Sequence, residues 1–313
     1  MLKDDLRNKR ILITGITGFV GKALSNRLKS LGSIVYGISR SVNNNPINLN
    51  ADILDYSKIN KFIKDSGIEI CFHLASSSLV EEGQVHPYQT FKINTEGTLN
   101  ILESARINNL EKVIIASTSH VYGDNSLPYI EKYFTKPSRP YETSKACADV
   151  IAQSYAESFN LSVLIPRFVN IYGPGDLNFQ RLIPKTIKSV LEGFSPQMWG
   201  GKAIRDYLFI DDAVEAYLLL AKVNIDKVGA NRIFNFGSGN MISVEELIKK
   251  IIKISGKSAK IEKIEDERMG EIKSQYVSWK KASNLLGWKP KISLEDGLRK
   301  TLEWYARFLK QDI

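Results

Sequence analysis

Short apolar runs that alternate with longer amphipathic segments fill the first half of this chain. Between Arg10 and about Arg167 the runs are ILIT, IVYGIS, IEICFHLA, KVIIAS and SVLIPR. They are rich in β-branched residues and almost continuously apolar, which is typical of strands buried on both faces, and helical segments between them imply parallel crossovers. The sequence therefore predicts an α/β fold built on a doubly wound parallel sheet.

The pattern loosens after residue 170. The turn-rich segment NIYGPGDLNF precedes an expected helix over 179–193, then loop and strand over 200–210, and the strand RIFNFG. Ser243 and Glu246 predict a capping box at the start of SVEELIKKI, and a last helix is expected over 294–309. We therefore expect residues 1–170 to form the sheet domain. Residues 171–313 should form mostly a smaller C-terminal α/β substrate lobe, with some segments returning to the sheet.

Composition limits the partners. The 313 residues are 43% hydrophobic, which is ample for a large core, and no apolar run is long enough to span a bilayer. The first residues, MLKDDLRNKR, lack the apolar core of a signal peptide, so we expect a cytoplasmic protein without membrane contact. The net charge of +9 favours a solvated basic surface first and an anionic ligand second. No nucleic-acid partner is expected, because the lysines lack interleaved aromatic residues.

The two cysteines offer little chemistry. Cys71 lies in an apolar run and Cys147 in an expected helix. Both are interpreted as reduced packing thiols, and no metal site is expected.

Three glycines follow the first expected strand and open the first expected helix. In ILITGITGFVGKAL they are Gly15, Gly18 and Gly21. Glycine allows a tight turn there, lets backbone N–H groups approach a pyrophosphate, and lets the helix pack closely on the strand, while the helix N-terminus favours an anion. The context predicts a Rossmann dinucleotide site, with cofactor contacts from Gly15, Thr17, Gly18, Phe19 and Val20.

The end of the second expected strand bears on the choice of cofactor. An acidic residue there would bind the ribose 2′-hydroxyl and favour NAD, but VYGISRS offers Ser39 and Arg40. A hydroxyl beside a guanidinium suits a 2′-phosphate, so the cofactor is expected to be NAD or NADP, with a slight preference for NADP. Arg40 could equally stack on the adenine or point into water. Asp52 and Ile53 are expected at the adenine edge, or else in a surface turn.

A tyrosine and a lysine share one face of an expected helix. In RPYETSKACADVIAQSYAESF, Tyr141 and Lys145 are four residues apart and so lie one turn from each other. A phenol is a weak base at its usual pKa of about 10, but a nearby ammonium and an oxidised nicotinamide favour the phenolate. Tyr141 could then take a proton from a substrate hydroxyl while hydride leaves the same carbon. Thr118, in STSHVYG at the end of a central strand, or a serine beside it can hydrogen-bond the reacting oxygen.

From TGITGFVG to LGWKPKISLEDGLRKTLEWY, nearly the whole chain resembles the extended short-chain dehydrogenase/reductase family. The resemblance implies nucleotide-activated sugars as substrates and a catalytic triad of Thr118, Tyr141 and Lys145, with Asn94 as a support. It also implies a homodimer in which helices near 88–108 and 141–160 of two copies form a four-helix bundle. Further residues that match family motifs are Leu74, Ala75, Ser76 and Asn94 for the cofactor site, and Asn170, Arg181, Arg205 and Arg268, with Glu271, for the substrate.

Arginines suit such a substrate because they can clamp a diphosphate with two parallel hydrogen bonds. Arg205 could instead pair with Asp206 or Asp211, which are close in sequence.

Within that family, PSRPYETSKACADVIAQSYAESFNL and EIKSQYVSWKKASNLLGWKP look most like the 4,6-dehydratase branch related to CDP-glucose dehydratases. Those enzymes carry an acid one or two residues after the catalytic hydroxyl, where this chain has Ser119 and His120. Both residues are candidate catalytic residues. His120 could donate a proton in place of the acid, bind a substrate hydroxyl or fill a packed corner.

These features predict an NAD(P)-dependent oxidoreductase that oxidises C4 of a nucleotide-activated hexose or heptose, either as a net 4-dehydrogenase or as a 4-epimerase. The enzyme alternative is a nucleotide-sugar 4,6-dehydratase that uses His120. A non-catalytic, dinucleotide-sensing regulator would keep the glycine turn but would need none of Thr118, Tyr141 and Lys145. Their joint presence argues against it.

Overall fold

Eight parallel strands form the main sheet of the computed structural model, which describes residues 6–42, 47–264 and 272–311. The strand order is β11-β7-β5-β4-β1-β2-β3, and β6 also pairs with β7. The strands are β1 (Arg10–Thr14), β2 (Ile34–Ser39), β3 (Asn48–Asn50), β4 (Ile70–His73), β5 (Lys112–Ile115), β6 (Ser117–Thr118), β7 (Val163–Phe168) and β11 (Ile233–Phe236). The chain runs outward from β1 to one edge and then to the other, so the strand order reverses between β1 and β4. Ligands of such sheets bind at the carboxyl ends of strands beside the reversal.

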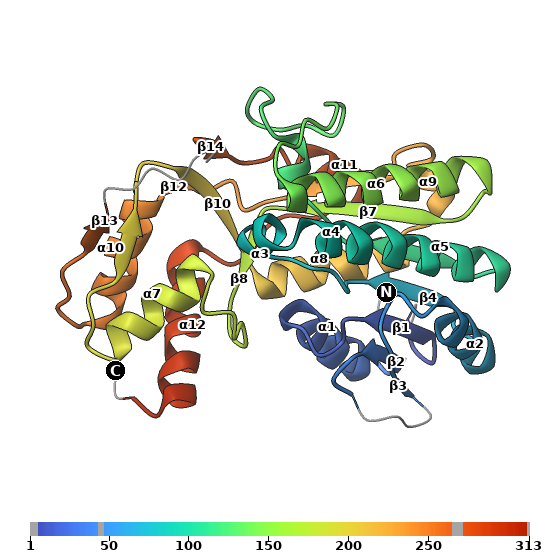
Figure 1. Cartoon of the computed structure of the whole chain (residues 1–313), viewed down its shortest axis with the longest axis horizontal. Coiled ribbons are helices and arrows are strands. Elements are labelled where there is room, and N and C mark those ends of the chain that lie inside the picture. Colours follow the sequence, from blue (N-terminus) through green and yellow to red (C-terminus); the bar gives the residue numbers. More distant parts are fainter. Residues whose placement is uncertain (1–5, 43–46, 265–271, 312–313) are drawn as a thin grey trace.

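Helices cover both faces of this sheet (Figure 1), and the predicted doubly wound fold is confirmed. One face carries α1 (Phe19–Ser30) and α8 (Ile210–Lys222), and the other carries α2 (Tyr56–Ser66), α5 (Gly97–Ile107) and α6 (Pro140–Ser158). In β1, Ile11 and Ile13 pack in the core under α1, whereas Leu12 packs in the core under α2. Side chains alternate between the two faces of a strand, so a strand buried on both faces must be apolar throughout.

A smaller lobe follows the main sheet, with α7 (Leu182–Leu191), α10 (Val244–Ser255) and α12 (Leu294–Leu309) at its centre (Figure 1). Its short strands are β8 (Asn170–Tyr172), β9 (Gln197–Trp199), β10 (Ile204–Phe209), β12 (Met241–Ser243), β13 (Glu262–Ile264) and β14 (Ser274–Gln275). Strand β10 pairs with β8, β12 and β14, and β9 pairs with β13. Because β8 follows β7 and β10 leads into α8, these two strands join the lobe to the main sheet.

Later segments cross back to the main sheet. Helix α8 covers one face, α9 (Ile225–Val228) follows it, β11 joins the edge beside β7, and α11 (Lys280–Leu286) packs against β11. The path of the chain therefore crosses between sheet and lobe several times.

The helix expected near 88–108 is one helical run after α3 (Val80–Val85). It consists of α4 (Pro87–Phe91), the π-helical segment η1 (Lys92–Glu96) and α5. Proline suits the first position of a helix, and single π-helical turns often mark functional sites. Asn94 lies in this π-helical segment.

Two expectations about the fold need correction. The helix expected over 179–193 begins only at Leu182, because the Asp176 and Asn178 side chains accept hydrogen bonds from the backbone two residues on and form turns. Cys71 is buried as expected, but Cys147 is exposed on α6 and does not pack in the core. Among the described residues, no helix has the length and apolarity needed to cross a bilayer.

Candidate active site

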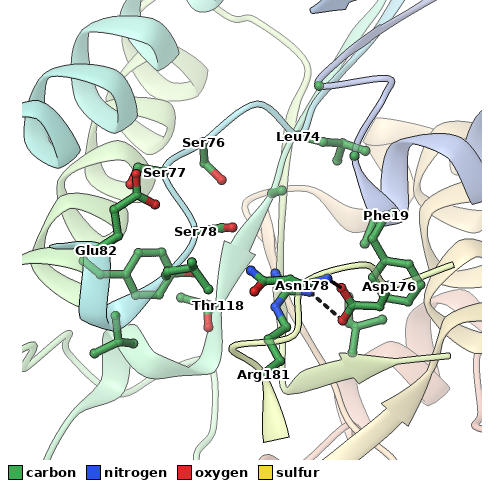
Figure 2. A pocket seen from close by; sticks show the side chains of 18 of the residues that line it. Phe19, Leu74, Ser76, Ser77, Ser78, Glu82, Thr118, Asp176, Asn178 and Arg181 are labelled. Carbon is green, nitrogen blue, oxygen red and sulfur yellow. Dashed lines mark hydrogen bonds and ion pairs between the residues drawn. The ribbon is translucent and has the colours of Figure 1, made fainter. Parts of the chain in front are cut away.

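One cavity of ≈ 890 Å³ lies where the carboxyl ends of β1, β4 and β6 face the C-terminal lobe. Figure 2 shows Ser76, Ser78 and Thr118 on one side of it and Phe19 and Asp176 on the other. The remaining predicted residues in its wall are Gly15, Thr17, Gly18, Val20, Ser39, Arg40, Asp52, Ile53, Leu74, Ala75, His120, Tyr141, Lys145, Asn170, Arg181 and Arg205. The structure thus brings cofactor and substrate candidates to one continuous space.

The glycine turn leaves room for a bound anion. Gly15 has a positive φ of 70°, and a Cβ there would meet the backbone of Ala75 at 3.0 Å. A Cβ on Gly21 would lie 2.3 Å from the Gly15 carbonyl oxygen, so only glycine lets α1 start so close to β1. Gly18 is the N-cap of α1 and supplies no capping side chain. The first N–H groups of the helix are therefore available to a pyrophosphate, and this end of the cavity fits a dinucleotide.

Hydroxyls gather at the end of β2. The Thr17 hydroxyl lies 2.7 Å from that of Ser39 and 3.1 Å from that of Ser41. Arg40 and Asp52 line the cavity nearby. The carboxylate that would bind a ribose 2′-hydroxyl is thus replaced at the strand end by a serine.

A buried histidine ties β1 to β4 beneath the cofactor end. Nδ1 of His73 lies 2.8 Å from the Thr14 hydroxyl, and Nε2 lies 3.2 Å from the Thr98 hydroxyl. Burial, assisted by the charge of Lys145, lowers the pKa of His73 to about 3, so the ring is neutral. The Thr14 hydroxyl also accepts from the N–H groups of Leu74 and Ala75. This network fixes the loop that faces the cofactor end.

The three predicted catalytic side chains meet in the wall of the cavity. Burial raises the pKa of Tyr141 to about 12, while the charge of Arg181 and a hydrogen bond with Thr118 oppose the shift. Burial lowers the pKa of Lys145 to about 8, against the charge of Asp149, and its ammonium donates to the Ala116 carbonyl at 2.5 Å. The Lys145 ammonium was expected to lower the pKa of Tyr141 and so favour the phenolate. The protein alone does not produce that lower pKa.

A buried ion pair holds Thr118 in place. Asp149 on α6 accepts from Nε of Arg167 at 2.8 Å and from the Ser117 hydroxyl at 2.8 Å. The Arg167 guanidinium also lies over the ring of Tyr122, 4.7 Å from its centre. These contacts fasten β6 between β7 and α6, so the strand that carries Thr118 is rigidly placed against the helix that carries Tyr141.

Asn94 supports the site but is not in the cavity wall. Its amide oxygen accepts from the N–H of Ser77 at 2.8 Å, and its amide nitrogen donates to the Ser77 carbonyl and to the Ser144 hydroxyl. This amide is engaged with protein, which fits the supporting role implied for Asn94, while a direct contact with cofactor stays a prediction. Asn94 thus connects the cofactor loop to α6.

The lobe supplies basic side chains. Arg181 pairs with Asp176 at 3.1 Å, and both line the cavity (Figure 2). Arg205 also lines it and donates to the Ile204 carbonyl. The carboxylate of Asp206, one of the two partners considered for Arg205, is buried and accepts hydrogen bonds from Ser238 and Gly239. The predicted Arg268 and its neighbour Glu271 lie outside the described residues.

The model of the NAD-dependent epimerase/dehydratase family matches residues 11–237 of this chain. The chain belongs to that family. The resemblance to extended short-chain dehydrogenases/reductases is thereby confirmed.

Individual members of the epimerase/dehydratase family match over almost the full length. A putative UDP-glucose 4-epimerase of Methanocaldococcus jannaschii is 31% identical, with 94% of this chain and 97% of the relative covered. The solved UDP-glucose 4-epimerase of Thermotoga maritima with UDP-glucose superposes with a TM-score of 0.89 at 28% identity, over 96% of this chain and 99% of that one. A dTDP-glucose 4,6-dehydratase of Streptomyces venezuelae with NAD bound gives a TM-score of 0.86 at 25% identity, over 95% and 97% of the two chains. Two of the three reactions considered from the sequence, 4-epimerisation and 4,6-dehydration, thus occur among the relatives.

In this epimerase/dehydratase family member, the two residues after Thr118 lie on different sides of a 3₁₀ turn, η2 (Ser119–Tyr122). His120 lines the cavity, with its ring 6.3 Å from that of Tyr141 in an edge-to-face arrangement. Ser119 is buried outside the cavity wall, and its hydroxyl has no hydrogen-bond partner in the described part of the chain. The placement therefore argues against Ser119 as a catalytic residue.

Sequence reasoning missed Glu142, which follows Tyr141 and lies behind His120. Its Oε1 is 3.4 Å from Nδ1 of His120 and accepts from Nε and Nη2 of Arg139 at 3.0 and 2.6 Å. The one available signal was a glutamate at the third position of the helix that starts at Pro140, a position that often turns back to the N-cap.

Proposed function

We propose that this protein is a nucleotide-sugar 4-epimerase, which oxidises C4 and returns hydride to the opposite face of the sugar. The observation that carries the proposal is that one cavity contains Thr118, Tyr141 and Lys145. The same cavity contains His120 at the position where dehydratases of the resembling branch have an acid. In the described part of the chain, the carboxylates of the cavity wall are Asp52, Glu81, Glu82 and Asp176, and none of them follows Thr118 directly.

The catalytic roles follow from the positions of the side chains. The glycine turn and α1 would hold the pyrophosphate of NAD, and bound NAD supplies the acceptor for hydride from C4. Tyr141 takes the proton from the C4 hydroxyl and later gives it back, while Thr118 hydrogen-bonds the same oxygen. Because burial raises the pKa of Tyr141 to about 12, the phenol needs added positive charge before it can act as a base.

The lobe would bind the diphosphate and nucleotide of the substrate. Arg181 and Arg205 are the cavity's arginines from the lobe side, and guanidinium groups bind phosphates with two parallel hydrogen bonds. Asn170, in β8, and Asn178 add amide donors to the same wall. Arg268 stays a prediction for this role.

We further propose that the cofactor site accepts NADP as well as NAD, with a slight preference for NADP. A 2′-phosphate beside Ser39 would meet the hydroxyls of Thr17 and Ser41 and the guanidinium of Arg40, and no carboxylate at the strand end would repel it. Dissociation constants of both cofactors for the wild type and Arg40→Ala test this. A preference for NAD that Arg40→Ala leaves unchanged would contradict it.

A homodimer is the assembly we propose. The helical run over 87–107 and α6 with its C-cap residue expose apolar side chains that a partner could cover, at Tyr88, Leu99, Ile107, Val150 and Phe159. Analytical ultracentrifugation at micromolar concentration tests it, and a monomer would contradict it. The cytoplasmic location expected from the sequence stays a prediction.

The reaction is tested by incubating the protein and NAD with UDP-, dTDP-, CDP- and GDP-sugars. We expect a product of unchanged mass that NMR identifies as the C4 epimer, without net formation of NADH. A 4-keto product with NADH would instead show a net 4-dehydrogenase. A product lighter by one water would show a 4,6-dehydratase and make His120, which lies beside Tyr141, the candidate acid.

A further inference from the structure

A buried carboxylate stands behind the cavity residue His120. The Glu142 side chain is 0% exposed, and the His120 side chain is 18% exposed. Oε1 of Glu142 faces Nδ1 of His120 at 3.4 Å, while Oε2 accepts weaker contacts of 3.4 Å from the N–H groups of Ser138 and Arg139. The distance to the imidazole is long, and hydrogen bonds in active sites commonly shorten when substrate binds.

The chemistry of the pair determines which nitrogen carries hydrogen. Burial by itself raises the pKa of Glu142, but the hydrogen bond with His120 and the charge of Arg139 outweigh it and lower the pKa to about 2. Glu142 is therefore an ionised carboxylate at neutral pH, and a carboxylate can only accept. A hydrogen bond between the two residues requires hydrogen on Nδ1.

The charge of the cluster is already balanced. Nε and Nη2 of Arg139 donate to Oε1 of Glu142 at 3.0 and 2.6 Å, so the carboxylate has a cationic partner without the imidazole. The carboxylate therefore does not depend on the imidazole for a cationic partner, and Nε2 is the remaining polar atom of the ring. The ring of His120 lines the cavity 6.3 Å from that of Tyr141, which is a separation that suits a contact with a sugar hydroxyl on a carbon next to the one on which Tyr141 acts.

We infer that Glu142 is a positioning residue that holds His120 as the Nδ1–H tautomer, so that Nε2 accepts a hydrogen bond from a sugar hydroxyl next to C4. The bond made by one ring nitrogen sets the state of the other. The tautomer follows from contacts within the protein, whereas the role toward the sugar rests on the proposed function.

The tautomer is measurable because the chain has three histidines, His73, His86 and His120. Long-range ¹H–¹⁵N NMR at mildly alkaline pH, with H86Q and H120Q to assign the signals, should show a neutral His120 with hydrogen on Nδ1. E142M, whose thioether accepts only weakly, should move the signal toward the Nε2–H form, whereas E142Q keeps an accepting amide oxygen and should move it less. E246Q, which alters a glutamate at the same position of α10, should leave it unchanged.

A ring with hydrogen on Nε2 alone, or on both nitrogens, in the wild type would overturn the inference. An unchanged His120 spectrum in both E142Q and E142M would do the same, because the tautomer would then not depend on Glu142.

Calorimetric binding of UDP-glucose to the NAD-loaded protein tests the role toward the sugar. H120L and E142M should each weaken binding of UDP-glucose by about three- to tenfold, which is the scale of one hydrogen bond. The double variant should bind no more weakly than whichever single variant binds more weakly, because the two side chains act on the same hydrogen bond. Additive losses would overturn the coupling of Glu142 to His120. A wild type that fails to bind UDP-glucose would overturn the sugar role and a UDP-glucose substrate, while the NMR result would stand independently.

Discussion

Helices α6 and α10 each have a glutamate at their third position, Glu142 and Glu246, but the two side chains make different contacts. In α10, Glu246 accepts from the N–H of Ser243 at 3.0 Å, and the Ser243 hydroxyl accepts from the N–H of Glu246 at 3.2 Å. In α6 the N-cap is Arg139, which has no acceptor, and its N–H reaches Glu142 only at 3.4 Å. The stronger contacts of Glu142 go to the guanidinium of Arg139.

The difference lies in where each helix begins. Helix α10 starts at the surface, where its glutamate is exposed and closes a complete capping box. Helix α6 starts at the cavity, so its first turn presents Tyr141 to the ligand space and buries Glu142 behind His120. The same position of a helix can therefore serve the helix itself or the site beside it, and the following variants separate the two roles.

The largest difference is expected at the second helical position, which is Tyr141 in α6 and Glu245 in α10. Tyr141→Phe should lower turnover of the nucleotide sugar at least about a hundredfold, because the C4 proton loses its acceptor. Cofactor affinity and the melting temperature should change little. Glu245→Gln should keep full turnover, and an active Tyr141→Phe would remove Tyr141 from the mechanism.

The next effect concerns stability. Glu142→Ala should lower the free energy of unfolding by about 2 kcal/mol, because it removes a buried carboxylate and leaves Arg139 without its ionic partner. The loss stays below that of a fully buried pair because the Arg139 side chain is 18% exposed and can reach water. Urea denaturation measures it, with Glu246→Ala as the surface control, and equal losses in both variants would contradict the comparison.

Low pH should remove the contribution of the Glu142 carboxylate to stability. The pKa of Glu142 is lowered from 4.5 to about 2 in the folded protein, so its contribution is fully present above about pH 4.5 and is lost as the pH falls toward 2. The difference in unfolding free energy between wild type and Glu142→Gln should therefore shrink over that window. Urea denaturation at stepped pH values measures it, and a difference that stays constant with pH would show that Glu142 is not held as a carboxylate.

Local sequence patterns were sufficient to predict the main elements of the fold. The apolar runs predicted the parallel sheet, and the capping box at Ser243 and the last helix over 294–309 are found as expected. These features depend on neighbours in sequence, such as the periodicity of a helix or the residue at its start.

The rest of the site depends on contacts between distant segments. Glu142 reaches His120 across 22 residues of sequence, and Arg139 at the N-cap is not a capping signal that would draw attention to the pair. His73 bridges hydroxyls on two other elements in the same way. That Ser119 is buried away from the cavity while His120 faces it follows from the 3₁₀ turn after β6, which the alternation of a strand does not predict.

The smallest effect is expected from Glu246→Gln, which changes the exposed glutamate of α10 in the same way as Glu142→Gln changes the buried glutamate of α6. A glutamine at this position can still accept from the N–H of Ser243, because its amide oxygen replaces a carboxylate oxygen, so the capping box keeps its geometry. The side chain is exposed, and what it loses is the favourable interaction of a negative charge with the N-terminus of α10, which solvent screens. Turnover should therefore equal that of the wild type, and the melting temperature should fall only slightly, by less than for Glu142→Gln. Differential scanning fluorimetry of the two variants side by side measures this. A fall for Glu246→Gln as large as that for Glu142→Gln would mean that the two glutamates stabilise their helices equally, and the special burial of Glu142 would then contribute nothing to the fold.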